Sequence, residues 1–192
     1  MSKTRTFIAI EPSPDVVGHA ERALLRLRRL ADNVKWVERG NLHWTLHFLG
    51  EIDDQELYDV CQAVERGAAE VEPFTLEAAG VGAFPSQSRP RTLWIGAGAG
   101  GEAMELLHSK LQEQLEPLGF RGENRRFVPH LTLGRAGRGL RPAETAALAE
   151  ELEKLVDFPA GNQVVDELTI FASRLRREGA EYTPVAHVPL AG

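Results

Sequence analysis

The chain of 192 residues contains a single cysteine, Cys61. An intrachain disulfide and a cysteine-based zinc site are therefore both excluded. No apolar run is long enough to span a bilayer, and no charged segment followed by an apolar one begins at Met1, so neither a membrane anchor nor a secretory leader is expected. These absences predict a protein of the reducing cytoplasm that has no membrane partner.

An excess of basic residues is also lacking. The chain has 28 Asp and Glu against 22 Lys and Arg, a formal net charge of −6. A protein of this charge has no overall attraction for nucleic acid or for an anionic membrane. Any phosphate-binding site must therefore be local. No linker or low-complexity segment divides the chain, so we expect residues 1–192 to form a single unit.

Two segments far apart in the chain share the pattern His-x-Thr-Leu. They are NLHWTLHFLG at 41–50 and PHLTLGR at 129–135. Alternation of polar and apolar residues with Trp, Thr, Phe and Leu is typical of a half-buried strand. We therefore expect both segments to be strands.

Side chains two residues apart on a strand share one face. His43 and Thr45 then point to one side and Trp44 to the other, into the core. His130 and Thr132 repeat the arrangement in the second copy. Two such faces brought together form a polar cavity with two imidazoles and two hydroxyls.

Two other interpretations of these residues were weighed. A single His-x-Thr segment is most often the solvent face of a sheet, but a second matched copy favours two similar lobes that face each other across a cleft. Zinc is the other rival, because His43 and His47 are four residues apart. That spacing serves a metal on a helix, and the glutamate of a zinc protease is absent. On a strand His47 shares the face of His43, but its role stays open, and no metal or cofactor is expected.

The remaining pattern alternates short strands with amphipathic helices. Several strands are joined by tight turns, which favours an α+β fold with antiparallel sheets over a doubly wound parallel sheet. Besides the motif strands, strands are expected at 5–10, 74–78, 92–96, 164–173 and 182–188, with 35–37 leading into the first motif strand and a loop at 85–91. Helices are expected within 17–31, 53–68, 104–118 and 142–155.

Arginines gather around the second motif. They are Arg121, Arg125, Arg126, Arg135, Arg138 and Arg141. In an acidic protein, guanidinium groups beside the expected cavity are what binding a polyanion requires, although a solvated loop remains the alternative.

Two imidazoles that titrate near neutral pH can act as a general acid and a general base. The hydroxyls of Thr45 and Thr132 can hydrogen-bond two oxygens of a tetrahedral anion. Such a site suits phosphoryl transfer to water without a metal, and a strained 2′,3′-cyclic phosphate is a suitable substrate. The symmetric motifs do not tell which histidine is the acid.

With these motifs the chain resembles the 2H phosphoesterases, which are named for two His-x-Thr/Ser-x motifs. Within them it is similar to the RNA 2′,3′-cyclic phosphodiesterases, formerly called 2′-5′ RNA ligases. The resemblance covers nearly the whole chain. It also includes Leu93-Trp94-Ile95-Gly96, and Ser173-Arg174-Leu175 with Gly179 and Tyr182.

The resemblance implies a bilobal α+β fold, with two pseudo-symmetric lobes of antiparallel sheet, helices outside and a central cleft. It implies hydrolysis of an RNA-terminal 2′,3′-cyclic phosphate to a 2′-phosphomonoester without a metal, together with a weak, reversible 2′-5′ RNA ligase activity. By this similarity His43 is the general acid and His130 the general base.

The resemblance also assigns substrate contacts. Thr45 and Thr132 would bind the phosphate and Arg135 would add positive charge to it. Strict alternation places Arg135 on the face opposite to His130, so this role requires the strand to end or bulge there. Phe48 is a candidate surface for stacking a base, although core packing explains it as well.

Other substrates and partners fit the same residues. A small cyclic nucleotide or a 2′,5′-linked oligonucleotide would suit the same chemistry. A non-catalytic protein that binds RNA ends is a third interpretation, but binding alone does not need two proton-transfer groups. We expect a monomer that acts on RNA ends or nucleotides bearing a 2′,3′-cyclic phosphate.

Overall fold

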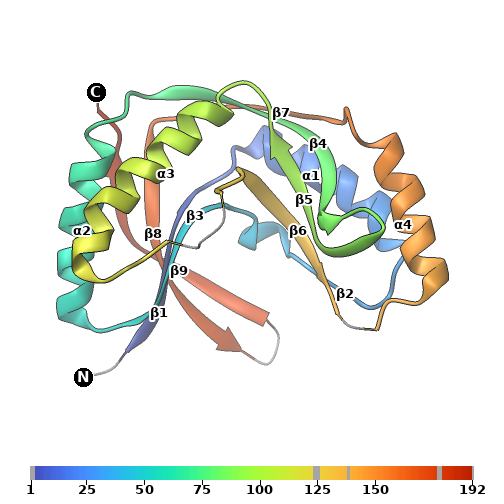
Figure 1. Cartoon of the computed structure of the whole chain (residues 1–192), viewed down its shortest axis with the longest axis horizontal. Coiled ribbons are helices and arrows are strands. Elements are labelled where there is room, and N and C mark those ends of the chain that lie inside the picture. Colours follow the sequence, from blue (N-terminus) through green and yellow to red (C-terminus); the bar gives the residue numbers. More distant parts are fainter. Residues whose placement is uncertain (1–2, 123–125, 138, 177–178, 192) are drawn as a thin grey trace.

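The structure, a computed structural model, describes residues 3–122, 126–137, 139–176 and 179–191. Within these residues one curled antiparallel sheet of nine strands is combined with four α-helices. The sheet arches, with α2 and α3 side by side over one half and α1 and α4 over the other (Figure 1). The expected antiparallel α+β fold with two lobes is confirmed.

The elements alternate along the chain. The strands are β1 (Thr4–Ile10), β2 (Val34–Trp36), β3 (Trp44–Ile52), β4 (Phe74–Ser86), β5 (Arg89–Ala97), β6 (His130–Ala136), β7 (Pro159–Val165), β8 (Glu167–Arg176) and β9 (Gly179–Pro189). The helices are α1 (Pro14–Arg28), α2 (Asp54–Ala68), α3 (Gly101–Leu115) and α4 (Pro142–Lys154), with short 3₁₀ turns at Arg39–Asn41 and Glu116–Leu118.

The strand order is nearly symmetric about its centre. It runs β7-β4-β5-β6-β3-β1-β8-β9, and β2 pairs with β6 off this path. The two motif strands, β3 and β6, are the central neighbours. Each has a long antiparallel partner on its outer side, β1 for β3 and β5 for β6. The two lobes are therefore arranged around the two His-x-Thr segments.

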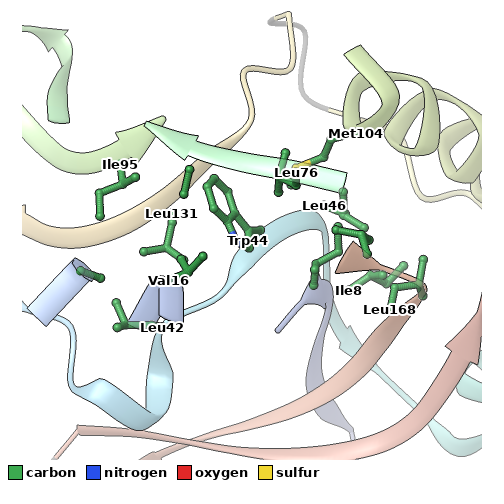
Figure 2. Close-up of a cluster of buried hydrophobic side chains, with 14 of the residues drawn as sticks. Ile8, Val16, Leu42, Trp44, Leu46, Leu76, Ile95, Met104, Leu131 and Leu168 are labelled. Carbon is green, nitrogen blue, oxygen red and sulfur yellow. The ribbon is translucent and has the colours of Figure 1, made fainter. Parts of the chain in front are cut away.

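A single residue pair joins the two halves at the centre of the sheet. Trp44 of β3 lies opposite Leu131 of β6, and both side chains are fully buried. Figure 2 shows Trp44 between Leu131 on one side and Leu46 on the other, within the main apolar core. On either side of this pair the strands separate, and β2 continues the pairing along β6. The polar residues that flank the pair are thereby left on the opposite face.

Local sequence signals begin and end the helices. Ser13 caps α1 ahead of Pro14, and its hydroxyl accepts from the backbone of Val16. Asp53 and Glu56 form the expected capping box at the start of α2. These caps satisfy backbone donors that the first helical turn leaves free.

Three sequence expectations need correction. Residues 35 and 36, which were expected to lead into the first motif strand, belong to a separate strand, β2, because a 3₁₀ turn intervenes before β3. The segment 85–91 is mostly strand, since β4 and β5 form one long hairpin with a turn at 87–88. The stretch 164–173 is divided between β7 and β8 at Asp166. The hairpin was not predicted from the sequence, because the prolines in it usually interrupt sheet pairing.

Leu131→Ala tests the junction between the halves. Leu131 is 0% exposed, so we expect a loss of roughly 2–5 kcal/mol in the free energy of unfolding, from lost apolar burial and an unfilled cavity. The matched control is Leu175→Ala, since Leu175 is 71% exposed and its loss should cost less than about 0.5 kcal/mol. Urea unfolding followed by circular dichroism measures both. Equal, small losses in the two variants would contradict this account of the core.

Candidate functional site

An open cleft of about 650 Å³ lies on the face of the sheet opposite to the core around Trp44. Its lining includes five of the six site residues predicted from the sequence. They are Thr45, Phe48, His130, Thr132 and Arg135. His43 is not among the lining residues, but it adjoins the cleft, because it lies two residues before Thr45 and directly precedes β3.

The register at the centre of the sheet explains how the four motif residues come together. Because Trp44 lies opposite Leu131 in an antiparallel pair, His43 falls opposite Thr132, and Thr45 falls opposite His130. All four side chains are half-buried, whereas their neighbours Trp44 and Leu131 are buried on the other face. By register, each histidine therefore lies across from the threonine of the other motif.

A bulge occurs at the same motif position in both strands. In β3 the register with β1 skips Leu46, and in β6 the register with β5 skips Leu133. The extra residue reverses the alternation, so the third residue after each threonine returns to the polar face. Phe48 in the first copy and Arg135 in the second thus line the cleft. The bulge that a phosphate-binding role for Arg135 requires is present.

A glycine in β6 follows from the same geometry. Gly134 comes directly after the bulge, where β2 crosses close to the strand. A Cβ at this position would lie 2.7 Å from the ring of Trp36 and 2.9 Å from a methyl carbon of Val34. The equivalent residue of β3 is His47, which pairs with β1, and among the described residues no second strand pairs with it as β2 does with Gly134.

Both motif histidines are held in the same way. The Nδ1 of His43 lies 2.7 Å from the carbonyl oxygen of Asn41, and the Nδ1 of His130 lies 2.7 Å from that of Val128. A carbonyl oxygen can only accept, so Nδ1 carries the proton in both rings. In the neutral ring Nε2 is then the basic nitrogen, and in the charged ring it is a second donor. The two Nε2 atoms are the ones available for proton transfer.

The surroundings of His43 favour its neutral form. Burial lowers the pKa of His43, the hydrogen bond to Asn41 raises it, and the positive charges of Arg135 and His130 lower it further. The side-chain amide of Asn41 donates to the carbonyl oxygen of Ala180 at 2.7 Å, which ties this support to β9.

Aromatic rings to which the sequence assigned no site role pack against the two histidines. Phe7 and Tyr182 lie 4.8 and 5.3 Å from the ring of His43, centroid to centroid. Phe84 meets His130 edge to face at 5.1 Å. These residues come from β1, β9 and β4, so only the sheet pairing brings them to the motifs. Phe48 is 57% exposed, which leaves its ring available to a ligand.

The arginines of residues 121–141 do not all lie at the cleft. Arg121 and Arg126 line the cleft together with Arg135. Arg126 also makes an ion pair with Glu105. Arg141 does not line the cleft and is bound instead to Glu144 and Asp32. Arg125 and Arg138 lie outside the described residues.

A stack of three rings forms part of the cleft wall. His47 lies 4.3 Å from His108 of α3, and His108 lies 4.1 Å from Phe127, with interplanar angles of 9° and 6°. The Nε2 of His47 donates to the carbonyl oxygen of His108 at 3.0 Å. Burial lowers the pKa of both histidines, and for His108, with the charge of His47 as a second cause, to about 4. His108 had no signal in the sequence, because it lies beside the apolar stripe of its helix.

His47 therefore has a clear structural partner. No group of three or more potential metal ligands occurs among the residues that the structure describes. No helix in the described part of the chain is long and apolar enough to cross a membrane.

Comparison with known proteins gives consistent matches over nearly the whole chain. A family model described as LigT-like phosphoesterase matches twice, at residues 10–94 and 95–182. A protein of Thermotoga maritima named RNA 2′,3′-cyclic phosphodiesterase is 32% identical and covers 93% of this chain and 91% of its own. One of Methanothermobacter thermautotrophicus with the same name is 33% identical, over 94% of this chain and 96% of its own.

Solved structures agree with this match. A crystal structure of a protein from Thermus thermophilus superposes with a TM-score of 0.79 at 27% identity and covers 98% of both chains. The two matches of the family model each contain one His-x-Thr segment. They agree with the near symmetry of the strand order.

The His47–His108 stack predicts a loss of stability in acid. Both rings are held neutral in the fold but become charged near pH 6.5 in the unfolded chain, so the unfolded state binds more protons below that pH. The free energy of unfolding should therefore fall as the pH drops from about 6.5 to about 4. His108→Phe keeps a flat ring in the stack and removes one titrating group. Its stability should fall less over this range, as measured by urea unfolding at several pH values.

The matched control is His19→Gln on α1, at a histidine outside the stack. It should keep the acid dependence of the wild type. If His108→Phe and the wild type lost stability equally between pH 6.5 and 4, the stack would not be a source of acid sensitivity.

Proposed function

The chain belongs to the LigT-like phosphoesterase family, and on this premise we propose that it hydrolyses the 2′,3′-cyclic phosphate at an RNA end to a 2′-phosphomonoester. The observation that carries the proposal is the pair of matched histidines. Each is tied through Nδ1 to a carbonyl oxygen, and together they flank two threonines beside one cleft. The relatives named RNA 2′,3′-cyclic phosphodiesterase support the choice of substrate.

The phosphate would lie between the two threonines. The hydroxyls of Thr45 and Thr132 donate to its two non-bridging oxygens, and the guanidinium of Arg135 offsets their negative charge. Arg135 is itself steadied by Thr92, whose hydroxyl lies 3.5 Å from Nη1. This set of donors supplies charge and orientation from side chains alone, so the proposed reaction runs without a metal.

Hydrolysis needs one proton taken and one given. The Nε2 of His130 takes a proton from the attacking water, whose oxygen bonds to phosphorus. The bond from phosphorus to the 3′ oxygen breaks, and the Nε2 of His43 gives its proton to that oxygen. The product keeps its phosphate on the 2′ oxygen. Proton exchange with solvent restores both rings.

The lowered pKa of His43 is compatible with the acid role. Burial and the nearby cations Arg135 and His130 disfavour its charged form. An anionic phosphate between the threonines has the opposite effect and raises this pKa. Protonation of His43 would thus accompany substrate binding. Because burial and the nearby cations still disfavour the charged ring, it gives up its proton readily to the leaving oxygen.

Ligation is a second, weaker activity of the same site. If the 5′ hydroxyl of a second RNA takes the place of water, the same proton transfers produce a 2′-5′ linkage. We further propose that residues 1–192 act as one bilobal unit, a monomer in the cytoplasm. The single cysteine, Cys61, is half-buried and suits a reducing compartment.

His43→Ala and His130→Ala should each lower kcat by roughly 10² to 10⁴ with the fold intact, because each removes one proton-transfer group. The double variant should lose much less than the product of the two losses, since the two groups act in one step. Turnover of a cyclic-phosphate RNA measures activity, and circular dichroism checks the fold. His19→Ala is the control and should keep wild-type turnover. A wild-type rate in either single variant would contradict the mechanism.

The product tests the reaction itself. A short RNA ending in a 2′,3′-cyclic phosphate is incubated with the protein and a chelator, and the phosphate isomer is identified by chromatography. We expect a 2′-phosphate at a rate unchanged by the chelator. A 3′-phosphate would contradict the assigned leaving group, and loss of activity in chelator would contradict metal independence. If the protein turned over only small cyclic nucleotides, these would take the place of RNA as its substrate.

A further inference from the structure

A second cavity of about 320 Å³ lies beside the β4–β5 hairpin. The hairpin forms one wall with residues 88–91, and Gly137 and Leu140 contribute to the other. Pro85 and Arg91 line both this cavity and the cleft of the motif residues. The two hollows therefore share a boundary, and together they form a groove that continues from the phosphate-binding position toward the tip of the hairpin.

The charge along this groove is of one sign. Arg89 and Arg91 line the second cavity, and both are exposed. None of the described residues that line either cavity is Asp or Glu, although the chain has 28 of them. In a protein with a net charge of −6, such a segregation makes the groove a local site for a polyanion.

Arg91 is positioned at the junction of the two cavities. Its Nη1 donates to the carbonyl oxygen of Gly137 at 3.4 Å, across the second cavity. A guanidinium has five donors, so the remaining ones can contact a phosphate. Arg126, which also lines the cleft, is less available to a polyanion, because it is already paired with Glu105.

We propose that the groove along the β4–β5 hairpin binds the nucleotides that precede the cyclic-phosphate end of a single-stranded RNA. The inference rests on the proposed function and adds to it the path of the strand. Arg91 meets the first internucleotide phosphate and Arg89 the next one. The protein thereby prefers an oligonucleotide over a cyclic mononucleotide, which reaches only the cleft.

Substrate length is the first readout. For the wild type, KM should fall from a 2′,3′-cyclic mononucleotide to a trinucleotide and then level off, because the groove has room for few residues. The salt dependence of KM should be steeper for the oligonucleotide, by about 0.7 in the slope of log KM against log salt for each phosphate bound.

Arg89→Gln is the decisive variant, since Arg89 lines the groove but not the cleft. On a pentanucleotide we expect kcat/KM to fall roughly 2- to 5-fold through KM, with a shallower salt slope, as for the loss of one exposed ion pair. Hydrolysis of the cyclic mononucleotide should be unchanged. Arg22→Gln, at an exposed arginine of α1, removes the same charge elsewhere and should leave both substrates unaffected.

Four results would each overturn the inference. They are equal KM and salt slopes for the short and long substrates in the wild type, an unchanged pentanucleotide KM in Arg89→Gln, an equal loss in Arg22→Gln, and an oligonucleotide-specific loss in Arg121→Gln alone. The last result would place the strand along Arg121, which lines the cleft but not the second cavity.

Failure of the proposed function is distinguishable from failure of this inference. If the wild type hydrolyses neither substrate, the proposed function fails. The groove is then judged by binding, with a fluorescent pentanucleotide that ends in a 3′-phosphate and is not cleaved. Weaker binding by Arg89→Gln than by Arg22→Gln supports the groove, and equal binding rejects it.

Discussion

The contact on which the site depends is the pairing of Trp44 with Leu131. Both side chains are fully buried, and they lie where the two halves of the sheet meet. Burial of these two residues requires their neighbours to face the other way, so the core dictates that two histidines and two threonines share one surface. The chemistry of the cleft and the stability of the fold are thus set by the same residue pair.

The period of the motifs made this arrangement predictable. Alternation in two matched segments identified the strands, the buried and polar faces, and four of the residues beside the cleft. The bulges were harder, because strict alternation puts Phe48 and Arg135 on the wrong face. Only the requirement that Arg135 contact phosphate suggested a bulge in β6. Nothing suggested the bulge in β3, whose signature, two consecutive buried residues at Leu46 and His47, is visible only in the structure.

Residues whose position depends on long-range pairing could not be predicted in this way. Phe84, His108 and Tyr182 reach the site from elements distant in sequence, and none belongs to a local pattern that marks it as functional. The hairpin of β4 and β5 was missed for a related reason. Pro85 and Pro90 lie opposite each other at its end, where paired proline residues replace the usual ladder.

The arginines show how sequence composition and site charge differ. The stretch 121–141 is basic, but Arg141 is paired with Glu144 of α4 and Arg126 with Glu105 of α3. Arg89 and Arg91 enter the groove from the β4–β5 hairpin, outside this stretch. Screening in cells limits such charges to about 8 Å, so only phosphates inside the groove experience them. The net charge of −6 gives the rest of the protein no overall attraction for RNA. On the proposed function, this charge distribution favours binding of the RNA end that enters the groove over binding of the rest of the RNA.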